Sequence, residues 1–158
     1  MARGRPYSAA IAAAQKLATK LHSSVYRATG GRVGGRMLGS PVLLLVTTGW
    51  KTGRSRTTPL FYLEDGGRYT IVASNGGALK TPLWWLNLRA NPRATAEVGG
   101  RRIPVRASEV GGEEKRRLWR ELVAMYPSYE AYRKRTDREI PVVLLEPERP
   151  NARKPGKG

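Results

Sequence analysis

The chain has no cysteine and only one histidine, His22. The absence of cysteine excludes disulfides, thiolate metal ligands and a cysteine nucleophile. A single histidine rules out a histidine-dependent triad and a multi-histidine metal site, and we read His22 as a residue on a helix surface. No carboxylate pair stands out as an acid–base couple, because residues 64–65 lie in a predicted turn and residues 113–114 at a predicted helix start. We therefore expect neither hydrolytic chemistry nor a metal.

Long hydrophobic runs are also missing. The longest apolar run, residues 41–46, is far shorter than the ~20 residues that a membrane-spanning helix needs. The N-terminus begins with Arg3 and Arg5 before an alanine-rich stretch and so imitates a secretory signal. Gln15 and Lys16 break its apolar core too early for a cleaved signal. We therefore expect a cytoplasmic protein.

Negative charge is scarce in this chain. Its 158 residues include 29 Lys and Arg but only 12 Asp and Glu, which gives a net charge of +17. Residues 1–63 carry ten Lys and Arg and no acidic residue. Such a field attracts nucleic acid, acidic lipid, or a phosphorylated or polycarboxylate ligand. A biased genomic composition would raise the arginine count as well, so charge alone does not choose among these.

Apolar periodicity and turn residues predict a mixed α+β domain. Successive hairpin signals at residues 64–67 and at Gly99-Gly100 favour a largely antiparallel sheet. About six strands are enough to curl into a small barrel with covering helices. A Rossmann site is not expected, because no G-x-G-x-x-G follows a strand. The expected elements are helices at 8–27, 81–91, 113–125 and 128–135 and strands at 42–48, 57–63, 68–74, 95–98, 101–108 and 140–145.

The N-terminal helix has an apolar stripe opposite a purely basic face. Two interpretations stay open: the helix lies on an anionic membrane, at the inner face of the bilayer, or it packs on its own domain. We divide the chain into this helix with a glycine-rich connector (1–36), a barrel domain (37–147) and a basic, disordered tail (148–158). The stripe is formed by Ile11, Ala14, Ala18, Leu21 and Val25, and the basic face by Lys16, Lys20 and Arg27.

The segment from Gly49 to Pro59 is the most informative part of the chain. It combines two glycines, three cations and four hydroxyls between two strand-like runs. Glycines let backbone N–H groups turn toward a ligand, and amides, hydroxyls and cations all favour an anion. The segment is therefore either a phosphate cradle or a basic hairpin loop that faces water.

Three further clusters contain groups that could meet a planar or anionic ligand. Residues 74–78, a Ser-Asn-Gly-Gly-Ala sequence, could form a backbone nest or a plain turn. Trp84 and Trp85 could be core residues, or one of them could border a pocket. A tyrosine stripe at Tyr126, Tyr129 and Tyr132 could stack on an aromatic ring or simply pack. An anion cradle, tight turns and aromatic walls together suit a cofactor that brings its own reactivity.

These segments, in this order, resemble the deazaflavin-dependent nitroreductase family. Its members are actinobacterial quinone reductases that use reduced coenzyme F420 on a split β-barrel. The resemblance is collinear over residues 37–147 and rests on four separate motifs. They are residues 47–60, residues 72–77, residues 82–84 with 87–92, and residues 125–129 with Tyr132.

The resemblance implies a role for individual residues. Lys51, Thr52, Arg54 and Arg56 would hold the phosphate and the start of the polyglutamate tail of the deazaflavin. The ring and ribityl chain would be lined by Thr58, Pro59, Phe61, Ser74, Asn75, Gly76, Gly77 and Ala78, with Trp84 as a wall. The substrate would face Tyr126, Ser128, Tyr129 and Tyr132. Phe61 stands where a close relative has tyrosine, and Asn75 where lysine occurs, which weakens the expected tail contact.

The implied reaction is hydride transfer from reduced F420 to a quinone, a nitroaromatic or a similar acceptor. A proton would come from Ser74, from the hydroxyl of Tyr126, Tyr129 or Tyr132, or from water. One alternative is an FMN- or haem-binding protein on the same kind of barrel. The other is a basic nucleic-acid-binding module, but the aromatic residues are not interleaved with Arg and Lys on strands as in single-strand binders. We therefore expect no specific nucleic acid.

Overall fold

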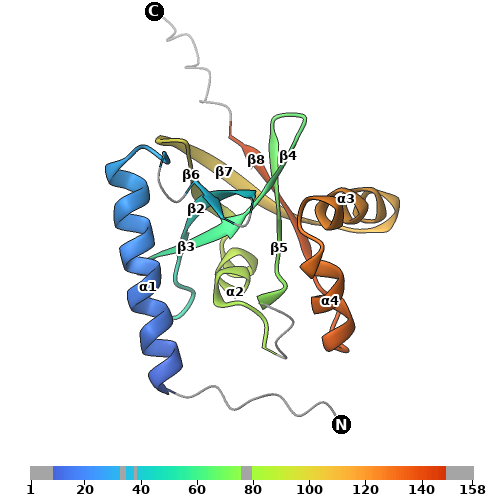
Figure 1. The fold of residues 1–158 in the computed structure, drawn as a ribbon, viewed down its shortest axis with the longest axis horizontal. Helices are drawn as coiled ribbons and strands as arrows, with labels where there is room; N and C mark the ends of the chain where they lie inside the picture. The colour runs from blue at the N-terminus through green and yellow to red at the C-terminus, as the bar shows by residue number, and fades with distance from the viewer. Residues whose placement is uncertain (1–8, 33–34, 38, 76–79, 149–158) are drawn as a thin grey trace, which may run out of the picture.

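The computed structural model describes residues 9–32, 35–37, 39–75 and 80–148. The element order follows the predicted one, helix first and a strand last (Figure 1). The helices are α1 (Ala9–Ala28), α2 (Leu83–Ala90), α3 (Gly112–Met125) and α4 (Ser128–Arg135). The strands are β1 (Arg36–Met37), β2 (Ser40–Thr48), β3 (Ser55–Phe61), β4 (Leu63–Asp65), β5 (Arg68–Val72), β6 (Arg93–Val98), β7 (Arg101–Val110) and β8 (Val142–Pro147).

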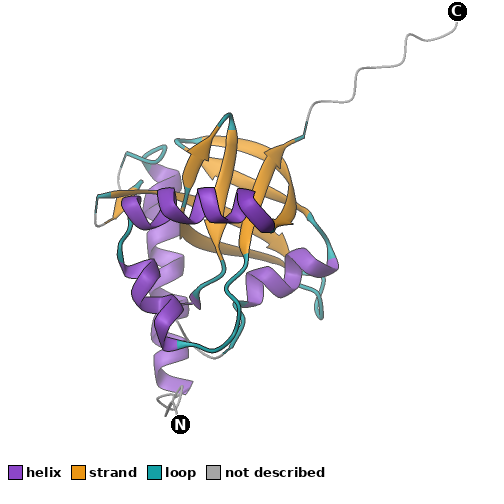
Figure 2. Cartoon of the chain, turned by 90° about the vertical axis from the view of Figure 1, so that its right-hand side faces the viewer, coloured by secondary structure: helices purple, strands orange, loops and turns teal. Residues whose placement is uncertain are grey.

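The described strands form one curled antiparallel sheet. Along the sheet the order is β1-β2-β6-β7-β8-β5-β4, with β3 paired to the other edge of β2. Every strand pair is antiparallel, as the short hairpin connections predict. Figure 2 shows the strands wrapped into a barrel with helices around it. The predicted α+β barrel with covering helices is confirmed.

The barrel closes through one interrupted strand. β3 pairs with β2 from Val42↔Phe61 to Thr48↔Ser55, and β4 pairs with β5 from Leu63↔Thr70 to Asp65↔Arg68. Only Tyr62 separates β3 from β4, so one stretch of chain joins the two ends of the sheet. We predicted a single strand over 57–63, and the change of partner at Tyr62 is what divides it. Counted around the barrel, β3 with β4 is the sixth strand.

Both predicted hairpins are confirmed, and glycine geometry explains them. Gly66 and Gly67 have φ of 59° and 82°, and Gly99 and Gly100 have φ of 55° and 82°. A two-residue turn that follows the twist of its strands needs positive φ at both central positions, which glycine adopts without strain. Each Gly-Gly pair thus fixes the register of the strands beside it.

Two apolar clusters lie on the two sides of the sheet. The first fills the barrel interior and includes Leu43, Leu45, Ile71, Trp84 and Trp85. The second lies between the sheet and the helices α3 and α4 and includes residues from all three. Its buried members are Val72, Val110, Leu118, Leu122, Tyr129, Ile140, Val142 and Leu144. The continuous apolar runs of β2 and β8 are therefore explained by burial on both faces.

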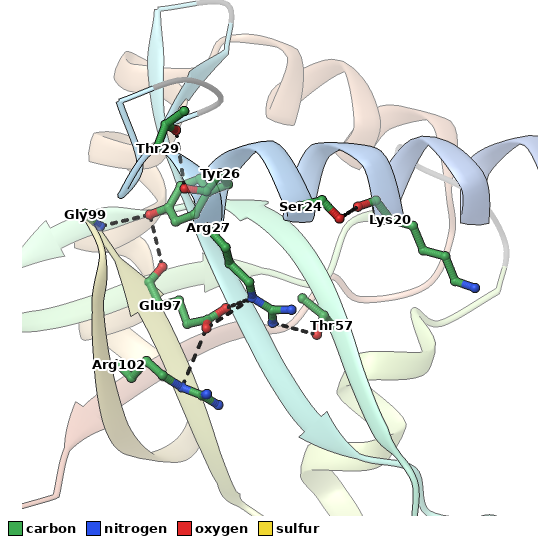
Figure 3. A network of polar contacts seen from close by, with 9 residues as sticks. All are labelled: Lys20, Ser24, Tyr26, Arg27, Thr29, Thr57, Glu97, Gly99 and Arg102. Carbon is green, nitrogen blue, oxygen red and sulfur yellow. Dashed lines mark hydrogen bonds and ion pairs between the residues drawn. The ribbon is translucent and has the colours of Figure 1, made fainter.

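Helix α1 is attached to the barrel through its C-terminal end (Figure 3). Tyr26 has only 1% of its surface exposed; its hydroxyl donates to the Glu97 carbonyl at 3.1 Å and accepts the Gly99 N–H at 2.9 Å. Arg27 Nε donates to the buried Glu97 carboxylate at 2.9 Å, and its Nη2 donates to Thr57 Oγ1 at 3.2 Å. The helix therefore touches both β6 and β3.

The apolar stripe of α1 does not face the barrel. Of the predicted stripe, Leu21 and Val25 are 66% and 36% exposed, and the neighbouring Leu17 is 70% exposed, while Ser23 and Tyr26 are buried. The helix thus packs on its own domain, but through a face that we did not predict, and it leaves open those members of the predicted stripe whose side chains the structure describes. Of the helices in the described part of the chain, none is long and apolar enough to cross a membrane.

Two smaller predictions were wrong. We expected a helix from residue 81, but α2 begins at Leu83 with Pro82 as its N-cap, and no side chain caps it. The glycine-rich connector was predicted without a strand, yet Arg36 and Met37 pair with Pro41 and Ser40 as β1. The second error has a simple cause, since a two-residue strand leaves no periodicity to read.

The Tyr26 hydroxyl gives the first prediction. Tyr26→Phe keeps the ring but leaves the Gly99 N–H without its acceptor, so the free energy of unfolding should fall by ~1–2 kcal/mol. Urea denaturation measures this change. The control is Tyr62→Phe, at a half-buried tyrosine whose hydroxyl has no bond among the described residues. An equal loss in both variants would contradict the role given to Tyr26.

Candidate functional site

The loop between β2 and β3 is a tight backbone turn. Gly49 N–H donates to the Arg54 carbonyl at 2.7 Å, and Gly53 N–H donates to the Gly49 carbonyl at 2.7 Å. Gly53 has a φ of 68°, which favours glycine. A Cβ on Gly49 would lie 2.7 Å from Thr52 Oγ1, closer than real atoms approach. The positive φ of Gly53 thus favours glycine, and a side chain at Gly49 would have to displace the Thr52 hydroxyl.

The cations of this loop are exposed and unpaired. Lys51, Arg54 and Arg56 all lie at the surface, and no carboxylate within the described ranges forms an ion pair with them. Lys51 Nζ lies 4.8 Å from the centre of the half-exposed Trp50 ring. Three neighbouring cations without a counter-ion repel one another, so an anion bound among them would relieve that repulsion.

Asn87 anchors the loop to α2. Its Oδ1 accepts the Trp50 N–H at 3.0 Å, and its Nδ2 donates to Thr47 Oγ1 at 3.1 Å. Asn87 is 5% exposed, so both bonds are shielded from water. The predicted motif of residues 87–92 therefore supports the predicted loop of residues 47–60, which sequence order alone does not show.

The site residues predicted on β3 do not share one face. Thr58 is on the same face of the strand as Leu60 and Tyr62, which pack in the barrel interior. Pro59 lies on the opposite side together with Phe61, whose ring centre is 4.8 Å from that of Tyr126. The structure thus joins Phe61 to the tyrosine cluster, with Pro59 on the same face of β3, and separates Thr58 from them.

The second predicted cluster is described only in part. Ser74 is buried and lies two residues after the end of β5, while Asn75 is exposed. Asn75 has a φ of 47° and donates from Nδ2 to the Lys80 carbonyl at 3.0 Å. Asparagine is among the few residues that tolerate this left-handed conformation. Gly76, Gly77 and Ala78 lie outside the described residues.

Both tryptophans of α2 are core residues in this structure. Trp84 is 6% and Trp85 7% exposed, and both belong to the cluster inside the barrel. Their rings lie 6.4 Å apart in an edge arrangement that aromatic pairs favour. The role of Trp84 as a pocket wall stays a prediction.

The three tyrosines form one aromatic cluster. Tyr126 caps the end of α3, and Tyr129 and Tyr132 lie on α4, so the cluster lies at the junction of the two helices. The hydroxyls of Tyr126 and Tyr132 are 3.0 Å apart, and the rings of Tyr126 and Tyr129 pack edge to face at 5.0 Å. Ser128, at the start of α4, is half-buried.

Two of the tyrosine hydroxyls, those of Tyr129 and Tyr132, have raised pKa values. Desolvation raises the pKa of Tyr129 far above its ordinary value, with a further contribution from its two tyrosine neighbours. The hydrogen bond with Tyr126 and then burial raise the pKa of Tyr132. A neutral phenol donates a proton in a hydrogen bond, so this cluster can act as a donor to an acceptor oxygen.

The residues that connect the clusters are the ones that the sequence did not reveal. Arg138 joins the end of β5 to the segment after α4 through two carbonyl hydrogen bonds. It is one arginine among many in a connection without periodicity, so no pattern marks it. The Tyr26 and Arg27 contacts were missed in the same way, since they depend on residues about 70 positions away.

Two further observations concern a possible metal site and a cavity outside the candidate site. Within the described ranges, no group of three or more His, Asp or Glu side chains could hold a metal ion. A cavity of about 250 Å³ lies between α1 and the β6–β7 hairpin, lined by Tyr26, Arg27, Glu97, Gly100 and Arg102. None of the predicted site residues lines it, and its charged groups already pair with one another. We therefore do not assign it to the candidate site.

Comparison with known proteins gives consistent matches. The model of the F420H(2)-dependent quinone reductase family matches residues 18–147. An F420H(2)-dependent quinone reductase of Mycobacterium tuberculosis is 45% identical over 130 residues, which are 80% of this chain and 87% of the relative. A solved F420-H2 dependent reductase is 41% identical with a TM-score of 0.63 and covers 70% of this chain and 98% of its own. Another solved chain, described as a domain-swapped dimer, is 36% identical with a TM-score of 0.65 and covers 84% and 99%.

The contact between α3 and α4 gives a pH prediction. The Arg133 guanidinium and then the Trp119 indole N–H hold the pKa of Glu130 down to about 2. A carboxylate with a depressed folded-state pKa stabilises the fold above its unfolded pKa and loses this contribution as pH falls through the folded one. Glu130→Gln should therefore lower the melting temperature at pH 7, and its difference from the wild type should shrink between about pH 5 and pH 2.

The control for Glu130 is Glu113→Gln, because the Glu113 side chain is 96% exposed. Its melting temperature should stay close to that of the wild type at every pH. A Glu130→Gln difference that does not depend on pH would contradict the assignment.

Proposed function

This chain belongs to the F420H(2)-dependent quinone reductase family, and we propose from that premise that its motif clusters form one deazaflavin site. The protein is an oxidoreductase that transfers a hydride from reduced coenzyme F420 to a quinone. The observation that carries the site is the hydrogen-bonded turn with three cations that no carboxylate in the described part of the chain pairs with, which β3 connects directly to the tyrosine cluster. We propose nitroaromatic compounds as a second acceptor class.

The donor groups of the loop fit the anionic part of the cofactor. Lys51, Arg54 and Arg56 supply charge, and Thr52 supplies a hydroxyl whose oxygen already accepts the Arg54 N–H at 3.2 Å. Charge-assisted hydrogen bonds to phosphate and carboxylate groups are about twice as strong as neutral ones. This loop would therefore bind the phosphate and the start of the polyglutamate tail.

The bound cofactor would supply the hydride, and the chain's own residues would position the reactants. Pro59, Phe61, Ser74 and Asn75 would line the ring side, and the tyrosine cluster would receive the acceptor. Holding two reactants at near-contact distance provides a large share of a rate enhancement. Of the predicted proton donors, Tyr126 and Tyr132 are the better placed, because both are only half-buried whereas Tyr129 is fully buried.

Cofactor binding tests the loop. Lys51→Ala and Arg56→Ala should each raise the dissociation constant of F420 by about tenfold, because each removes one charge-assisted contact to the anionic tail. Titration of the cofactor's fluorescence measures this constant. The control Arg120→Ala removes an exposed arginine of α3 and should leave the constant within about twofold. If the wild type does not bind F420, the assignment fails.

We also propose that α1 brings the enzyme to an anionic membrane surface. Leu17, Leu21 and Val25 form an exposed apolar stripe, and Lys16 and Lys20 lie beside it on a helix without acidic residues. An amphipathic helix with this pattern lies in the lipid interface, where its cations meet acidic headgroups. This would place residues 8–27 on the membrane and the barrel above it, with access to a lipid-dissolved quinone.

Sedimentation with vesicles tests the helix. Replacement of both Leu17 and Leu21 by Ser should lower binding to vesicles with acidic lipid by at least tenfold, since each buried leucine contributes ~1.5–3 kcal/mol. Leu83→Ser is the matched control, because Leu83 is 72% exposed but lies on α2. Equal sedimentation of the double variant and the wild type would remove the proposal.

A further inference from the structure

Arg138 connects two parts of the candidate site that are far apart in sequence. It lies between α4, which carries two of the tyrosines, and β8. Its Nη1 donates to the Ala73 carbonyl at 3.1 Å and its Nη2 to the Ser74 carbonyl at 2.7 Å. The backbone N–H of Arg138 donates to Thr136 Oγ1 at 3.3 Å. The Arg138 guanidinium thus links the segment that follows α4 to the residues that follow β5.

These two bonds hold the backbone where β5 ends. The Ala73 N–H still donates to the Pro141 carbonyl at 3.0 Å, in continuation of the β5–β8 ladder. After this bond the ladder ends, and the Arg138 guanidinium donates instead to the carbonyls of Ala73 and Ser74. Both peptide planes are therefore fixed on either side of Ser74, a buried residue that we place at the cofactor ring.

The next residue shows why this fixing matters. Asn75 adopts a φ of 47°, a conformation that asparagine tolerates better than most residues but that is still less favourable than an extended or helical one unless its surroundings hold it. Asn75 Nδ2 holds the Lys80 carbonyl on one side, and Arg138 holds the Ser74 carbonyl on the other. Hydrogen bonds from a charged donor are stronger than neutral ones, so the larger restraint comes from Arg138.

We propose that Arg138 is a positioning residue: it holds the Ala73 and Ser74 carbonyls and so places Ser74 and Asn75 against the cofactor, in fixed relation to the tyrosine helix. This inference rests on the proposed function. Arg138 does not touch the reacting atoms in this assignment. It acts through the backbone, so its loss moves the ring-binding residues and leaves the chemistry of the acceptor side intact.

The test compares Arg138→Met, which keeps much of the apolar stem without donors, with Arg138→Lys, which keeps one charged donor. With reduced F420 and menadione, Arg138→Met should lower kcat/KM for the cofactor by about 10- to 100-fold, the scale of a misplaced site. Arg138→Lys should recover part of this loss. The KM for menadione should stay within about twofold, and the control Arg116→Met, at an exposed arginine of α3, should change neither value.

A merely structural role gives a different result. Loss of folded protein lowers the apparent kcat but leaves the KM for reduced F420 unchanged, and an unchanged KM in both Arg138 variants would overturn the proposal. If Arg138→Met does not fold, Arg138→Lys decides by the same criterion.

Hydrogen exchange separates this inference from the proposed function. In the absence of cofactor, the amides of Ser74 and Asn75 should exchange faster in Arg138→Lys than in the wild type, while amides in β6 and β7 keep their rates. If the wild type does not use reduced F420, the proposed function fails, and faster exchange confined to these residues still supports the restraint by Arg138. Unchanged exchange at Ser74 and Asn75 would overturn it.

Discussion

The change of partner at Tyr62 is the constraint on which the rest of the structure depends. Because β3 pairs with β2 and β4 with β5, this one stretch of chain closes the sheet into a barrel. It also carries the basic loop at its start and Phe61 near its end, so closure of the barrel sets the path between the basic and aromatic parts of the candidate site. A strand paired with β2 alone would leave β5, and with it Ser74, unconnected to the loop.

Much of the fold could be predicted from the sequence because its strongest signals are local. The Gly66-Gly67 and Gly99-Gly100 turns need positive φ at both positions, and that need is visible in the residues themselves. The exposed cations of the loop and the grouping of the tyrosines followed from composition and the family resemblance. The opposite orientations of Thr58 and Phe61 follow from the alternation of side chains along any strand, but which of the two faces the barrel interior depends on the strands that become its partners.

Long-range polar contacts account for the remaining differences. Tyr26 turns α1 toward the barrel because its hydroxyl finds partners in the β6–β7 hairpin, whereas the apolar stripe of the same helix predicted another orientation. Arg138 finds its acceptors 64 and 65 positions earlier in the chain. A side chain of this kind has no periodic neighbours, so only the assembled fold shows its role.

The distribution of the scarce carboxylates explains why the loop cations stay available. Glu97 pairs with Arg27 and Arg102, and Asp65 pairs with Arg68 and Arg117, whose hydrogen bonds lower the pKa of Asp65. The first pairing secures α1 and the second secures α3 against the β4–β5 hairpin. Acidic residues thus serve the attachment of helices, and none pairs with Lys51, Arg54 or Arg56 in the described part of the chain. The same Arg27 that binds Glu97 also contacts Thr57, the residue after Arg56. A membrane surface bound to the exposed side of α1 would therefore contact a helix that is already hydrogen-bonded to β3, the strand that follows the basic loop.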